Sequence, residues 1–87
     1  MSAIDEVIAA TQVLIEKNNE TTVAGRVLEE RIEEALRLLI AAGAEFAVEC
    51  MTQAKDTLEK LMAQLAAAAQ AAEEIQSIAA AAKAGGT

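Results

Sequence analysis

The sequence lacks four residue types. Its 87 residues include no proline, histidine, tryptophan or tyrosine, and a single phenylalanine, Phe46. Without proline, long helices run without the kink that this residue imposes. Without histidine, hydrolytic triads, histidine-based proton transfer and the Glu-x-x-His ligand pairs of carboxylate-bridged metal bundles are excluded. The single cysteine, Cys50, excludes an internal disulfide.

The acidic residues and the cysteine do not match the pattern of a known catalytic or metal site. One cluster of carboxylates is present, made of Glu29, Glu30, Glu33 and Glu34. No histidine accompanies it, so we interpret it as a solvated helix face rather than a metal site. Cys50 follows an acidic residue that works against a thiolate, so we interpret it as a small apolar residue beside a helix seam, with a cross-chain disulfide as the alternative. We expect no enzymatic activity, metal, cofactor or small-molecule substrate.

Positive charge is scarce and dispersed. The chain has 7 basic and 14 acidic residues, a net charge of −7 and a pI near 4.4. Nucleic acids and anionic membrane surfaces need clustered lysine and arginine, so both are excluded as partners. The longest uncharged run, residues 61–72, is too short to span a bilayer. A basic-then-apolar secretory signal is not apparent, so we expect a chain made in the cytoplasm, with signal-less export left open.

What the sequence does have is alanine, leucine, glutamate and isoleucine, the composition of long helices. In its second half, apolar residues recur every three and four positions, as in a helix that lies along another helix. That seam reads Ala47, Met51, Ala54, Leu58, Leu61, Leu65, Ala68, Ala72, Ile75, Ala79 and Ala82. The first half carries a matching seam: Ile4, Val7, Thr11, Leu14, Asn18, Thr21, Gly25, Leu28, Ile32, Ala35 and Leu39.

Gly43 is the natural turn between the two seams, because glycine accepts the left-handed conformation that ends many helices. If the chain folds back there, the seams meet layer by layer, and Gly25 makes room for Leu61. The sequence therefore predicts an all-α antiparallel two-helix hairpin over residues 1–84, with arms at about 3–42 and 45–83. Residues 85–87 are expected to form a flexible tail. A turn or kink within Asn18–Thr22 is the alternative.

The core expected inside the hairpin is a subset of the two seams. Its members are Ile4, Val7, Leu14, Leu28, Ile32, Leu39, Met51, Leu58, Leu61, Leu65 and Ile75. Further apolar residues remain outside the seams, and a band of them on both arms indicates a second interface. We expect Ile8, Ile15, Leu36, Leu38, Val48, Met62 and Ile78 to contact a partner chain, completing a four-helix bundle as a homodimer or heterodimer.

The start Met-Ser-Ala-Ile-Asp-Glu-Val, the two matched arms and the alanine-rich close Gln70-Ala-Ala-Glu-Glu-Ile resemble the small helical hairpins of the Trp-X-Gly type. The resemblance implies dimeric four-helix bundles, and in many cases type VII secretion or service as adaptor to a larger protein. Here the turn is Ala42-Gly43-Ala44, without tryptophan, and only Gly43 matches the motif. The tail lacks the Tyr-x-x-x-Asp/Glu export signal.

The pattern favours an interaction protein: a small adaptor, chaperone or secretion partner that buries apolar bands against another helical chain. The alternative is a self-assembling structural subunit, either a homo-oligomeric bundle or a filament. The sequence does not name the partner, decide between a homo- and a hetero-oligomer, or say whether the chain is exported.

Overall fold

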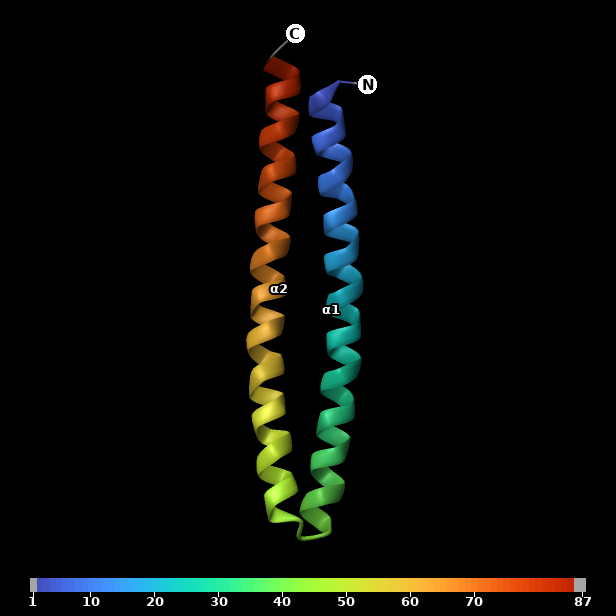
Figure 1. The fold of residues 1–87 in the computed structure, drawn as a ribbon, viewed down its shortest axis with the longest axis vertical. Coiled ribbons are helices and arrows are strands. Elements are labelled where there is room, and N and C mark those ends of the chain that lie inside the picture. Colours follow the sequence, from blue (N-terminus) through green and yellow to red (C-terminus); the bar gives the residue numbers. More distant parts are fainter. Residues whose placement is uncertain (1, 86–87) are drawn as a thin grey trace. The chain divides into compact units, whose positions relative to one another are not determined.

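The chain folds as two α-helices joined by a short turn. A computed structural model describes residues 2–85, in which α1 covers Ala3–Ala41 and α2 covers Glu45–Gly85, returning antiparallel to α1 (Figure 1). The predicted all-α antiparallel hairpin is confirmed. Its completion as a four-helix bundle stays a prediction. Gly85, expected in a tail, is the last residue of α2, and the rest of that expected tail lies outside the described residues.

α1 passes through Asn18–Thr22 without a break, so the alternative turn at that position is not present. Threonine is a weak helix former, partly because its hydroxyl competes for backbone groups. Here the competition is resolved within the helix, since the Thr21 hydroxyl donates to the Lys17 carbonyl oxygen at 2.9 Å. The polar middle of α1 is therefore compatible with one long helix.

The start of α1 is capped by its own first turn. The Ser2 hydroxyl oxygen accepts a hydrogen bond from the Asp5 backbone N–H at 3.1 Å. In return, the Asp5 carboxylate accepts from the Ser2 backbone N–H at 3.3 Å and from the Ser2 hydroxyl at 3.0 Å. This reciprocal pair is a capping box with Asp in place of Glu, and it satisfies amides that the helix leaves without partners.

Gly43 ends α1 in the left-handed conformation, with φ of 70°. The Gly43 N–H donates to the Ile40 carbonyl at 3.1 Å, and the Ala44 N–H donates to the Leu39 carbonyl at 3.0 Å. These two bonds form the Schellman motif, which satisfies the last carbonyls of a helix. α2 starts at once, because the Ala44 carbonyl accepts from the Val48 N–H at 3.0 Å. The predicted turn therefore lies at Gly43.

The chain divides into two compact units. The terminal unit combines α1 up to Thr21 with α2 from Leu65 onward, and the turn unit covers Thr22–Gln64. The terminal unit buries Thr11 and Ala72, and the turn unit buries Ile32 and Leu58 together with the backbone of Gly25. No large side chain in residues 2–85 is fully buried, so each unit has a thin core.

Candidate functional site

Three parallel stripes on each helix, each repeating every seven residues, describe the site. The shared stripe is Ile4, Thr11, Asn18, Gly25, Ile32 and Leu39 on α1, and Met51, Leu58, Leu65, Ala72 and Ala79 on α2. The inner stripe is Ile8, Ile15, Thr22, Glu29 and Leu36 on α1, and Val48, Lys55, Met62, Ala69 and Gln76 on α2. Every residue of these two stripes is buried or half-buried, so together they form the seam between the helices.

The outer stripe lies on the other side of the shared stripe. It consists of Val7, Leu14, Thr21, Leu28 and Ala35 on α1, and Ala47, Ala54, Leu61, Ala68, Ile75 and Ala82 on α2. All its members are apolar except Thr21. Its large side chains are about half exposed, from 43% at Leu61 to 55% at Leu14.

The structure therefore places five of the eleven expected core residues outside the seam. Ile4, Ile32, Leu39, Met51, Leu58 and Leu65 lie in the seam as expected, whereas Val7, Leu14, Leu28, Leu61 and Ile75 are exposed. Conversely, Ile8, Ile15, Leu36, Val48 and Met62, expected to face a partner, are half-buried seam residues. The residue against Gly25 is accordingly Met62, not Leu61. Leu38 and Ile78 remain exposed, at 66% and 62%.

Polar residues enter the seam because their ends reach polar partners at its edge. In the turn unit, the Lys55 ammonium lies 3.5 Å from the Glu33 carboxylate. In the terminal unit, the Gln76 amide N–H donates to the Gln12 side-chain oxygen at 3.0 Å. Long amphipathic side chains can pack their stems while their heads stay in water. A seam containing Lys55 and Gln76 is therefore compatible with helix packing. A search of the sequence for apolar residues alone would reject this stripe.

Each unit consequently presents one apolar face. On both helices the outer stripe follows the shared stripe by three residues. A two-fold axis normal to the plane of two antiparallel helices exchanges them, so the two outer stripes lie on the same side of that plane. The outer stripes thus combine Val7, Leu14 and Ile75 in the terminal unit, and Leu28 and Leu61 in the turn unit. Ile78 extends the first face, since it stands three residues after Ile75 and such residues are neighbours on a helix.

Sequence reasoning missed the exposure of Phe46, the only aromatic side chain, which is 78% exposed in the first turn of α2. It stands on neither the seam nor the outer stripe. Its signal in the sequence was its isolation: a lone aromatic residue outside both apolar patterns. Val13, Val23 and Val27 are also exposed and lie away from the outer stripe.

The acidic residues singled out in the sequence are spread over separate contacts. Glu33 pairs with Lys55 as described, and the Glu34 carboxylate lies 3.6 Å from the Arg31 guanidinium. Within residues 2–85, no group of three or more histidine, cysteine or acidic side chains is placed to hold a metal ion. Cys50 is a free, half-buried thiol. Neither helix, over the part of the chain that the structure describes, is apolar enough over sufficient length to cross a membrane.

Asp5 carries the clearest electrostatic signature of the terminal unit. Its carboxylate pairs with the Lys83 ammonium of α2 and accepts the two Ser2 hydrogen bonds. The hydrogen bond from Lys83, followed by those from Ser2, lowers the pKa of Asp5 below its ordinary value of 3.8. The carboxylate is therefore held ionised, and it links the two helices beside their seam.

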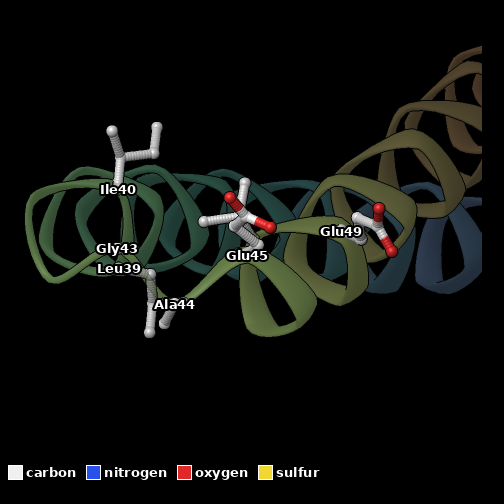
Figure 2. A pocket seen from close by; sticks show the side chains of 7 residues that line it. Leu39, Ile40, Gly43, Ala44, Glu45 and Glu49 are labelled. Carbon is white, nitrogen blue, oxygen red and sulfur yellow. The ribbon is translucent and has the colours of Figure 1, made fainter.

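A second surface feature is an open hollow of about 430 Å³ beside the turn. Its lining residues are Leu39, Ile40, Gly43, Ala44, Glu45, Val48 and Glu49 (Figure 2). In Figure 2 the side chains of Leu39 and Ile40 point in opposite directions, and Glu45 and Glu49 stand along α2. The hollow combines aliphatic walls with two carboxylates.

Comparisons with protein families, with curated proteins and with solved structures each find no match to this chain. The fold itself defines the class, a two-helix all-α hairpin.

Proposed function

We propose that this chain is a non-enzymatic interaction protein whose apolar faces are covered by another helical chain. The observation that carries the proposal is the outer stripe: both helices keep apolar residues on the same flank of the seam, and the large side chains among them are about half exposed. Helices that bury one stripe in their own hairpin and a second against a neighbour have about three apolar positions in seven, as in bundle helices. The shared, inner and outer stripes together occupy three positions in every seven on each helix.

Surface area supports the same proposal. The chain exposes 6219 Å², whereas a folded monomer of 9.1 kDa exposes about 4,900 Å² on average. The excess of about 1,300 Å² exceeds the roughly 800 Å² that each partner buries in a standard protein–protein interface. Because its core is thin, the hairpin gains stability when part of this area is buried against a partner.

The role that fits is an adaptor, chaperone or secretion partner, made in the cytoplasm and binding a helical segment of another protein. A relationship to the Trp-X-Gly hairpins of type VII secretion belongs to this proposal, supported by the pattern of the arms and by Gly43 at the turn. The alternative is a self-assembling subunit, in which a second copy covers the same face. A closed two-fold contact would give a dimer, and an open head-to-tail contact a filament.

The test uses two neighbouring residues of nearly equal exposure. Leu28 lies on the outer stripe and is 50% exposed, whereas Val27 lies off it and is 49% exposed. We expect Leu28→Gln to lower the mass of the complex in light scattering and to lower its melting temperature. The matched control, Val27→Gln, should leave both unchanged. Equal effects of the two substitutions would contradict the assignment of this face.

The same measurement separates the two roles. A purified chain that is a helical dimer of fixed mass, and that loses helix on dilution, supports the self-assembling subunit. A purified chain that is a weakly helical monomer, and that gains helix only with a second protein, supports the adaptor. A fully helical monomer that melts cooperatively, with no mass change at high concentration, would contradict both.

A further inference from the structure

The hollow beside the turn lies on the flank of the seam opposite the outer stripe. Glu45 and Val48 precede the shared-stripe residue Met51 by six and three positions, and Ile40 follows Leu39 directly. The outer-stripe positions nearest the turn are Ala35 and Ala47, and neither lines the hollow. A ligand in the hollow would therefore not compete with a chain covering the outer stripe.

Ile40 is out of pattern on this flank. The α1 residues that follow the shared stripe by one position are Asp5, Gln12, Asn19, Arg26, Glu33 and Ile40. Five are polar or charged, as expected for a flank in water, and only Ile40 is apolar. It is 64% exposed, so the packing of the hairpin does not account for it. Together with Val48, Ile40 gives the hollow an aliphatic wall that is open to water.

The charge around the hollow is negative from two sources. Glu45 and Glu49 stand one helical turn apart, and the structure of residues 2–85 records no ion pair for either. The last turn of α1 contains no basic residue, so the partial negative charge at its C-terminal end has no side-chain cation to offset it. A volume of about 430 Å³ is within the range of pockets that hold small groups.

We propose that this hollow binds a segment of another protein in which an apolar side chain stands next to a lysine or arginine. The apolar side chain packs against Ile40 and Val48. The cation lies beside the Glu45 and Glu49 carboxylates. Charge complementarity selects this partner, because an acidic segment would be repelled by the two carboxylates and a purely apolar one would leave them without a counter-charge.

The test is a titration of the full-length, isotope-labelled chain, under conditions where its helix content is complete, with two matched peptides. The probe is Ac-Leu-Arg-NH₂ and the control is Ac-Leu-Glu-NH₂. We expect the arginine peptide to give saturable shifts of the backbone amide signals of Gly43, Ala44 and Val48, and added salt to weaken them. The acidic peptide should bind at least about five-fold more weakly, since it replaces attraction by repulsion.

Two variants and one control locate the contact. Glu45→Gln with Glu49→Gln should weaken the arginine peptide by about two- to five-fold. Ile40→Gln should abolish saturation, whereas Val13→Gln, at an exposed residue of the terminal unit that lies away from the outer stripe, should leave the affinity for the peptide unchanged. Circular dichroism checks that each variant retains its helix content.

Three outcomes would overturn the proposal. One is equal binding of the acidic peptide, and another is an unchanged affinity in Ile40→Gln. The third is a set of turn-residue shifts that grow with protein concentration alone, which would mean that a second copy occupies the hollow. Each result is independent of the Leu28→Gln experiment, so failure of this inference leaves the proposed function of the outer stripe intact.

Discussion

Gly25 and Met62 provide a direct test of how the two helices fit together. A Cβ atom built at Gly25 would overlap the Met62 sulfur and lie 3.4 Å from its terminal methyl carbon. Alanine is favoured over glycine inside a helix by about 0.8–1.0 kcal/mol. Moving the methionine away from its preferred rotamer costs about 0.5–1.5 kcal/mol. The two terms nearly cancel, so Gly25→Ala alone should change the free energy of unfolding by less than about 1 kcal/mol.

The cancellation disappears when the methionine is shortened. In a Met62→Ala background, the new methyl group at Gly25 has room, and Gly25→Ala should stabilise the hairpin by about 1 kcal/mol. The difference between the two backgrounds is the coupling energy of the pair, expected to be about 0.5–1.5 kcal/mol. Urea unfolding of all four proteins, followed by circular dichroism at one fixed protein concentration, measures this coupling.

Leu61 is the matched control for this cycle. It is adjacent in sequence and of similar size, but 43% exposed on the outer stripe. We expect Gly25→Ala and Leu61→Ala to be additive within about 0.5 kcal/mol. Coupling that is larger with Leu61 than with Met62 would contradict the packing of Met62 against Gly25 and favour the register in which Leu61 faces Gly25.

Three further predictions concern single residues. Gly43→Ala should destabilise the hairpin by about 1–2 kcal/mol in urea unfolding, because alanine is strained at a φ of 70°; no loss would contradict the Schellman turn. Asp5→Asn should lower the melting temperature above pH 3.8, because there the ionised Asp5, whose pKa is lowered in the folded chain, stabilises the fold. The difference in melting temperature between this variant and the parent should vanish as the pH falls through that lowered pKa. A difference that does not depend on pH would count against the pairing of Asp5 with Lys83. Thr11→Val should change the free energy of unfolding by less than about 0.5 kcal/mol, because the buried hydroxyl bonds only the Val7 carbonyl at 2.7 Å within its own helix; a large loss would show that the hydroxyl has a further partner.

The turn and the helices could be predicted from the sequence because their signals are local. Gly43 interrupts an otherwise continuous helical pattern, and a left-handed glycine is a common way to end a helix. Ser2 and Asp5 have the spacing of a capping box. The match between the two arms predicted the antiparallel hairpin, since antiparallel helices joined by a short turn pair residues at similar distances before and after that turn.

The phase of the seam could not be predicted from apolarity alone. Choosing the stripe with fewer polar residues selects Val7, Leu14 and Leu61 and rejects the stripe that contains Glu29, Lys55 and Gln76. A hairpin with three apolar positions in seven has two candidate seams, and the more apolar one is the better candidate only if the chain is alone. Lys55 and Gln76 of the inner stripe reach Glu33 and Gln12 on the opposite helix, and neither helix alone shows that these partners are within reach.

The middle of α1 has a consequence for how the chain opens. Asn18, Asn19, Thr21 and Thr22 each cost about 0.5–0.7 kcal/mol relative to alanine, and Gly25 about 1 kcal/mol, so this stretch gives up roughly 3 kcal/mol of local helix stability. The boundary between the two compact units falls inside it. Hydrogen exchange should therefore reveal two protected blocks in α1, separated by amides that exchange early at the centre of the helix rather than only at its ends. Although α1 is one continuous helix, it would then open, over seconds to hours, as two shorter cooperative segments.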